Sequence, residues 1–95
     1  MRDKTLILKL TAAYKKDLRK AEARGFDIDG KLLPALAIML AGLRLPDHYR
    51  DHPLSGEWTG YREFHAAPDW LVIYRIVRNY LVLARTGTHA DLFKK

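Results

Sequence analysis

The distribution of apolar and polar residues along the chain predicts a strand followed by a helix. Near the start, the segment "TLILKL" is short, apolar and partly β-branched, which is typical of a strand. The segment "TAAYKKDLRKAEARGF" then has a helical period. Its apolar stripe consists of Leu10, Tyr14, Leu18 and Ala21. A second stripe is basic and consists of Lys15, Lys16, Arg19 and Lys20. Gly25 is suited to the end of this helix, where a left-handed residue is common.

A second, more apolar helix is expected in "KLLPALAIMLAGLRLP", ending near Gly42. Pro34 fits only if this helix begins around Leu32 or Leu33, because the N–H groups of a first turn have no helical partner. The two helices would form a hairpin whose apolar faces point toward a sheet.

The second half of the chain indicates a loop and then β-structure. "LPDHYRDHPLSGEW" contains Pro46, Pro53 and Gly56 without any period, so a loop is expected. "YREFHA" alternates, "WLVIYRIV" is nearly all apolar as in a central strand, and "YLVLAR" alternates weakly. In the final "TGTHADLF", Thr88 and Asp91 are spaced like a helix N-cap and its N3 partner.

The connections between the last three strands are short, "APD" and "RN", and short connections make antiparallel neighbours. The expected order is therefore a meander with "WLVIYRIV" in the middle. The predicted fold is α+β, in the order β-α-α-β-β-β, with the helix hairpin packed on an antiparallel sheet. At 95 residues, residues 1–95 are expected to form one domain.

This topology brings polar residues together at one end of the sheet. The end of "YREFHA" and the end of "YLVLAR" both lie beside the start of "WLVIYRIV". His65, Asp69, Trp70, Arg85 and the following "TGTH", with His89, should therefore share one rim. Two imidazoles, a carboxylate and a guanidinium would meet there.

Composition narrows the setting in which this rim works. The chain has a net charge of +6, which favours polyanions such as RNA, DNA or the ribosome surface, or an acidic protein partner. It has no cysteine, so disulfides and thiolate metal sites are excluded. No apolar run is long enough for a signal peptide or a membrane span, so a cytoplasmic location is expected.

The rim has the groups needed to cut an RNA strand. A base must take the proton from a ribose 2′-OH, a cation must stabilise charge on the phosphate, and an acid must protonate the leaving 5′-oxygen. Neutral imidazole titrates near neutrality and can act as either base or acid. Arg85 offers a fork that matches phosphate oxygens, and Asp69 can orient a histidine. No cofactor or metal is expected, because no ligand pattern as recognisable as HExxH is present.

Each of these residues also has a structural interpretation. His65 could be an ordinary residue at a strand end, Asp69 the turn residue after Pro68, and His89 part of a helical first turn. Arg85 could pair with Glu63. For Trp70 a core position is favoured. The loop that carries His52 reaches the rim only by folding back, and His48 has only a structural interpretation.

The motifs of the second half resemble a known toxin family. "DHPL", "GYR", "HxxPDW" and "RTGTHxxLF", within residues 49–93, look like the YafQ branch of the RelE/ParE toxin superfamily. The first half is similar only in its strand–helix–helix pattern. The resemblance implies a RelE-like fold, with two helices on a twisted antiparallel sheet. It also implies a toxin of a type II toxin–antitoxin pair.

Such toxins are endoribonucleases that cut mRNA in the ribosomal A site. By motif, the resemblance assigns catalytic roles to His52, His65, Asp69, Arg85 and His89. It gives Phe93 a role in holding RNA or the C-terminal segment. Our interpretation puts His65 with Asp69 on the nucleophile side and His89 on the leaving-group side. The basic stripe of the first helix and the sheet rim would contact ribosomal RNA.

The resemblance also implies a partner antitoxin, acidic at least in the segment that binds the toxin. DNA binding would come through the antitoxin, and no membrane partner is expected. Two alternatives remain at this point. A ParE-like toxin directed at gyrase shares the fold but lacks this histidine set. A non-catalytic module that binds RNA or the ribosome fits the charge but does not explain the clustering of His65, Asp69, Arg85 and His89.

Overall fold

A computed structural model describes residues 5–93 of the chain. It is an α+β structure built on a five-stranded mixed sheet in the order β1-β5-β4-β3-β2. The strands are β1 (Ile7–Leu10), β2 (His52–Pro53), β3 (Arg62–Ala67), β4 (Trp70–Val77) and β5 (Tyr80–Gly87). The helices are α1 (Ala12–Ala23), α2 (Leu33–Leu40) and α3 (His89–Leu92), with short helical turns at Ile28–Leu32, Asp47–Tyr49 and Gly56–Trp58.

The two longer helices begin and end where the sequence predicts. The hydroxyl of Thr11 caps α1 by accepting a hydrogen bond from the N–H of Tyr14, at 3.0 Å. Gly25, with φ of 84°, follows the last turn. A π-helical turn over Ile28–Leu32 leads into α2, which places Pro34 in its first turn, where its missing N–H costs nothing.

The central part of the sheet is the predicted antiparallel meander of β3, β4 and β5. The prediction that the whole sheet is antiparallel is wrong, because β1 runs parallel to β5, in register from Ile7 opposite Tyr80 to Leu10 opposite Leu83. A helical crossover separates β1 from the later strands, and such a connection allows parallel pairing. The residues predicted as a loop also contain β2, which pairs with β3 at the sheet edge, where Pro53 is tolerated.

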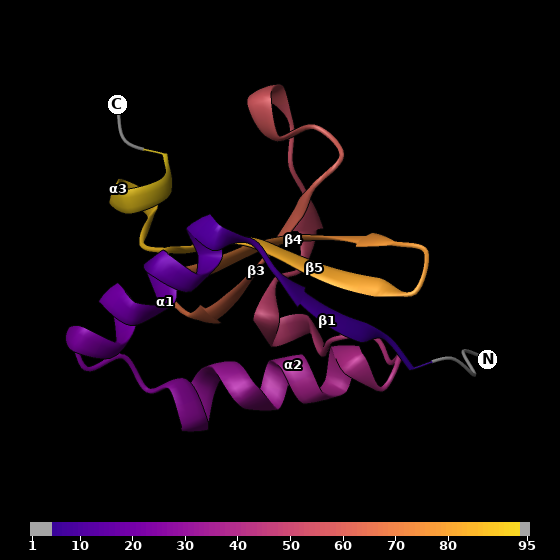
Figure 1. Cartoon of the computed structure of the whole chain (residues 1–95), viewed down its shortest axis with the longest axis horizontal. Helices are drawn as coiled ribbons and strands as arrows, with labels where there is room; N and C mark the ends of the chain where they lie inside the picture. The colour runs from indigo at the N-terminus through magenta and orange to yellow at the C-terminus, as the bar shows by residue number, and fades with distance from the viewer. Residues whose placement is uncertain (1–4, 94–95) are drawn as a thin grey trace.

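The hydrophobic core lies between the sheet and the helices. In Figure 1, α2 crosses one side of the sheet, while α3 and the loop after β2 rise on the opposite side. Leu36 and Met39 of α2 are buried in one cluster with Phe64, Val72 and other sheet residues. Tyr14 and Ala21 bring α1 into the same cluster. Over residues 5–93, no helix has the length and apolarity that crossing a bilayer would require.

Candidate active site

Strand pairing places four of the polar residues on one face of the sheet. Glu63 of β3 lies opposite Ile73 of β4, which lies opposite Arg85 of β5, and His52 of β2 completes this row by pairing with Glu63. Directly paired residues project to the same face of a sheet. His65, two residues after Glu63, shares that face. Phe64 between them belongs to the core on the other face, so the row points away from α2.

His52 is held by a carboxylate that the sequence did not single out. Its Nε2 lies 3.0 Å from Oε2 of Glu63, and its Nδ1 lies 3.1 Å from the carbonyl oxygen of Pro53. Only 5% of Glu63 is exposed, although it is a charged residue. A buried carboxylate needs a hydrogen-bonding partner, and His52 supplies one. The structure thus brings His52, the least constrained candidate, into the row.

His65 lies between the other two imidazoles. Its ring centroid is 6.2 Å from that of His52 and 6.1 Å from that of His89. Burial lowers the pKa of His65, and the nearby positive charge of Arg50 acts in the same direction, whereas Glu63 opposes them. The lowered pKa favours neutral imidazole, the form that accepts a proton.

Asp69 orients His89 rather than His65. Its Oδ1 accepts hydrogen bonds from the backbone N–H of His89 and from the ring Nδ1, both at 2.9 Å. The backbone hydrogen bond, followed by the ring hydrogen bond, lowers the pKa of Asp69 and keeps it ionised. A carboxylate can only accept, so Nδ1 carries the proton and Nε2 is the nitrogen left for chemistry. The predicted pairing of Asp69 with His65 is therefore wrong.

The short helix α3 is fixed at its start, which fixes His89. Thr88 and Asp91 form the predicted capping box, with hydrogen bonds of 2.9 and 3.1 Å between each side chain and the other's backbone N–H. Asp91 also accepts two hydrogen bonds from Arg24 at the end of α1. The ring of Phe93 lies 6.4 Å from that of His89, which brings the last candidate residue to the same place.

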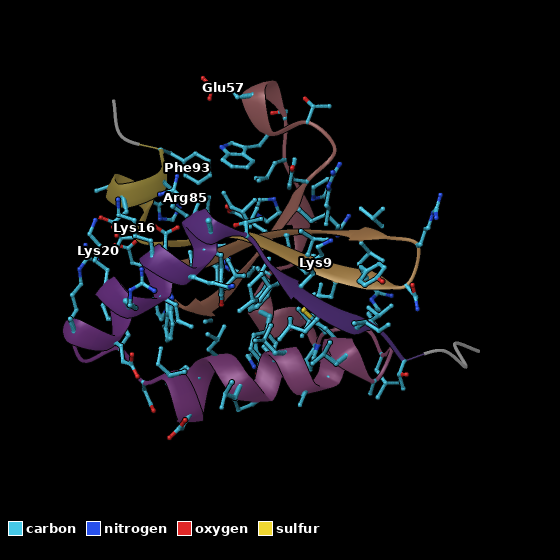
Figure 2. All side chains as sticks on the ribbon, viewed as in Figure 1. Lys9, Lys16, Lys20, Glu57, Arg85 and Phe93 are labelled. Carbon is cyan, nitrogen blue, oxygen red and sulfur yellow. The ribbon has the colours of Figure 1, made fainter. Side chains whose placement is uncertain are left out.

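Arg85 is held from α1. Its Nε and one Nη donate to the carboxylate of Asp17, and the longer of these hydrogen bonds is 3.1 Å. Asp17 also accepts from the backbone N–H of Thr86 at 3.1 Å. The alternative that Arg85 pairs with Glu63 is therefore wrong. Two of its three guanidinium nitrogens are engaged, which fixes the plane of the group. Figure 2 places Arg85 and Phe93 close together on the side of the sheet that faces away from α2.

Trp70 has the structural role that the sequence favoured. It is only 3% exposed, and Phe26 packs edge-on against it with ring centroids 5.0 Å apart. Its indole N–H donates to the hydroxyl of Thr86 at 2.9 Å, and that hydroxyl donates to the carbonyl of Leu71 at 2.7 Å. The indole thus joins β4 to β5 directly beneath the turn that carries Asp69.

The basic stripe of α1 is on the surface, as its spacing predicts. Lys15, Lys16, Arg19 and Lys20 are all exposed. In Figure 2, Lys16 and Lys20 extend outward from α1, on the same side of the molecule as α3. This surface is available to a polyanion.

Two residues of the site, Glu63 and Asp17, were not identified from the sequence as functional. Glu63 is a charged residue in an alternating strand, two positions before His65, and this spacing was the available signal. Asp17 is an acidic residue within the basic stretch of α1. Nothing in its spacing indicates a partner 68 residues away.

Three of these groups have the composition of a metal site. His52, Glu63 and His65 each offer a ligand atom, and these atoms lie within 4.8 Å of one another. Oε1 of Glu63 and Nδ1 of His65 are buried and have no hydrogen-bonding partner among the described residues. Two imidazoles and a carboxylate suit zinc or copper ions. The residues present therefore fit a divalent transition metal.

Comparison with known proteins places the chain in a family. Residues 6–94 match the family described as bacterial toxin of type II toxin–antitoxin system, YafQ. The chain belongs to the YafQ toxin family. A YafQ relative from Escherichia coli K12, described as mRNA interferase toxin YafQ, is 41% identical over 87 residues, which are 90% of this chain and 94% of the relative.

Solved YafQ-like structures have the same overall fold. The toxin in the crystal structure of the E. coli DinJ-YafQ toxin–antitoxin complex is 40% identical and superposes with a TM-score of 0.84, over 94% of this chain and 98% of the other. A metal-bound toxin from Helicobacter pylori is 34% identical, with a TM-score of 0.85, over 93% of this chain and 99% of the other. These likenesses cover both helices and the sheet of the YafQ fold.

Proposed function

We propose that this toxin is an mRNA interferase that cuts mRNA in the A site of the ribosome by attack of a ribose 2′-OH. The family and the relatives named as mRNA interferases support endoribonuclease activity. The observation that carries the mechanism is the row of three imidazoles on one sheet face, with a carboxylate on His52 and another on His89. The RelE-like strand and helix order, one domain over residues 1–95 and a cytoplasmic location belong to the same proposal.

In the first half of the reaction, neutral His65 takes the proton from the 2′-OH, and the oxygen attacks the adjacent phosphorus. A lowered pKa keeps His65 ready for this role. Arg85 presents its remaining nitrogen to a phosphate oxygen and stabilises the negative charge that builds up there. His52, held by Glu63, lies beside His65 and positions the attacking ribose.

In the second half, the bond from phosphorus to the 5′-oxygen breaks. That oxygen takes a proton from Nε2 of His89, while Asp69 holds the Nδ1 proton and fixes the ring. The products are a 2′,3′-cyclic phosphate and a 5′-hydroxyl. This division of base and acid keeps the roles assigned from the sequence for His65 and His89, with Asp69 moved to the leaving-group side. Phe93 stacks beside His89 and holds the strand.

The partners follow from the same proposal. The exposed basic stripe of α1 contacts ribosomal RNA, with the mRNA in the A site reaching the histidine row. A neutralising antitoxin, acidic at least in the segment that binds the toxin, covers the site or blocks entry to the ribosome. The YafQ toxin of E. coli has been solved in complex with DinJ, which supports such a partner. DNA is contacted only through the antitoxin.

The proposed reaction uses side chains alone. A divalent ion held by His52, Glu63 and His65 would act as a Lewis acid toward a phosphate oxygen. It would also occupy imidazole nitrogens that the metal-independent reaction requires. Two H. pylori toxins of this fold are described as metal-bound and copper-bound, so this question can be tested directly.

The deciding experiment maps mRNA cleavage on translating ribosomes and identifies the ends of the fragments. We expect cuts within A-site codons, 5′-hydroxyl ends, and full activity of toxin pretreated with EDTA and assayed in its magnesium buffer. Fragments with 5′-phosphates, or activity restored only by added zinc or copper, would contradict the metal-independent mechanism. Binding to ribosomes without any cleavage would support the non-catalytic module instead.

A further inference from the structure

The surface beside His65 is hollowed on the side away from His89. The hollow has a volume of about 370 Å³ and is lined by Lys31, His48, Arg50, His65 and residues 66–68. No carboxylate is among the residues that line it. Basic and imidazole side chains from the turn before α2, from Asp47–Tyr49 and its cap, and from β3 thus converge on one space. A concave surface of this composition attracts an anion.

Arg50 differs from the other arginines close to the site. Arg24, Arg62 and Arg85 each form an ion pair with an aspartate. Arg50 has no such partner within residues 5–93, and its positive charge is close enough to contribute to the lowered pKa of His65, after burial. A guanidinium without a carboxylate retains its full capacity to donate to phosphate oxygens.

The backbone that carries Arg50 is well anchored. Arg50 has a left-handed conformation, with φ of 54°, and its N–H donates to the carbonyl of Asp47 at 2.9 Å. The ring of His48 lies 4.2 Å from that of Tyr49, and Tyr49 packs edge-on against the buried Phe64 at 6.2 Å. The turn is thus fixed to the core, and it presents its cations at a constant place beside His65.

A second hollow continues the path past the turn at Pro68. Its volume is about 400 Å³, and it shares Lys31 and Ala67 with the first. Phe26 and Trp70 give it apolar walls, and Asp69 lies at its edge. The carboxylate disfavours phosphate there, while the apolar walls suit a nucleobase.

We propose that these two hollows form a subsite for the nucleotide next to the scissile bond, with its phosphate among Lys31, His48 and Arg50 and its base against Phe26. This subsite deepens the proposed function and rests on it, because His65 belongs to both the catalytic row and the wall of the first hollow. A single RNA strand would then be held on both sides of His65: by Arg85 at the reacting phosphate, and by Arg50 at its neighbour.

The chain provides a matched pair of variants for the test. Arg50 and Arg78 are both exposed arginines with left-handed backbone conformations, with φ of 54° and 57°. Arg78 lies in the turn between β4 and β5, on a part of the molecule that does not line either hollow. Arg50→Gln and Arg78→Gln therefore change the net charge equally and make equal demands on the backbone.

Binding is measured by fluorescence anisotropy, at several salt concentrations, with a labelled single-stranded RNA that carries 2′-O-methyl groups and cannot be cut by 2′-OH attack. Arg50→Gln should weaken binding by about tenfold. It should also reduce the slope of log affinity against log salt by about 0.7, the value for one phosphate contact on a single strand. Arg78→Gln should leave both quantities close to those of the wild type.

Equal losses in the two variants would overturn the subsite, since only overall charge would then matter. Unchanged binding by Arg50→Gln would overturn it as well, and so would a wild-type toxin that does not bind this RNA. Cleavage of unmodified mRNA on ribosomes is measured in parallel. If the wild type binds RNA through Arg50 but never cuts, the proposed function fails while the subsite stands.

Discussion

At the scale of single residues, the site separates side chains that perform chemistry from side chains that hold the framework. His89 is exposed and its removal leaves no cavity, so His89→Ala should cost less than about 1 kcal/mol in the free energy of unfolding. Its cleavage rate should fall by about 10²- to 10⁴-fold, the usual contribution of a general acid or base. Thermal unfolding and cleavage of mRNA on ribosomes measure the two effects.

Trp70 gives the contrasting control. Because it is buried and hydrogen-bonded to Thr86, Trp70→Ala should cost about 3–5 kcal/mol in stability. Wild-type cleavage by His89→Ala would remove the catalytic interpretation. A His89→Ala variant that loses activity only through unfolding would return His89 to a structural role.

The pH dependence of cleavage should report on His65. Burial lowers its pKa below the ordinary 6.5, so the base stays neutral, and active, further into the acid range. The acidic limb of kcat/KM should therefore lie below pH 6.5. A neutral buried histidine also binds fewer protons than in the unfolded chain, so its contribution to stability is present at neutral pH and lost as the pH falls through that region. An acidic limb at or above pH 6.5 that persists in His65→Ala would assign the base elsewhere.

At the scale of elements, α1 and α3 serve as supports for groups that sit on the sheet. Asp17 of α1 is the clearest case, since its carboxylate holds both Arg85 and the backbone of Thr86. Asp17→Asn keeps one acceptor and the size of the side chain, but loses the charge that fixes the guanidinium. We expect kcat to fall by up to about 10²-fold while KM changes little, because a small misplacement of a positioned group affects the reaction more than binding.

Steady-state kinetics of Asp17→Asn, with Asp29→Asn as an exposed control on the turn before α2, measures this effect. Equal kinetics in the two variants would show that Arg85 does not depend on α1. A rise in KM alone would show that Asp17 serves binding rather than positioning.

Gly87, where β5 passes into α3, sets the position of His89. A Cβ at this residue would meet Cβ and Oδ2 of Asp91 at 2.9 Å, closer than real Cβ contacts allow. Gly87→Ala should therefore displace the capping box and reduce cleavage, with little effect on the core. Adding Asp91→Ala should bring almost no further loss, because both changes disturb the same contact. Losses that multiply in the double variant would show that the two residues act separately.

Much of this arrangement was accessible from the sequence, and the missing parts have a common cause. Hairpin connections of a few residues brought Asp69 and His89 to one rim, and the Thr88–Asp91 spacing gave the cap of α3. The parallel pairing of β1, the contact from Asp17 to Arg85 and the contact from Glu63 to His52 all depend on how distant segments meet. Local patterns carry no information on such contacts, so the partner of Arg85 was assigned wrongly and Asp69 was given to the wrong histidine.

At the scale of the whole molecule, the charge of +6 predicts that ribosome binding depends on salt. Lys16 and Lys20 extend from the side that carries α3, so Lys16→Glu combined with Lys20→Glu should weaken binding strongly. Lys9→Glu combined with Arg78→Glu changes the net charge by the same amount elsewhere on the surface. Ribosome co-sedimentation at increasing salt compares the two. Affinity that does not change with salt, or equal losses in both variants, would contradict a specific role for α1.

The pairing of β1 with β5 determines when the toxin becomes dangerous during its own synthesis. β1 supports the strand that carries Arg85, and Thr11 donates a hydrogen bond to the carbonyl of Ala84, 73 residues later. His89 and Phe93 come later still. A growing chain is made from its N-terminus at about 5–20 residues per second, and it has no histidine row until its last strand has left the ribosome and docked against its first. The ribosome that makes the toxin is therefore protected from it by the order of the fold, and an antitoxin has to act only on the finished chain.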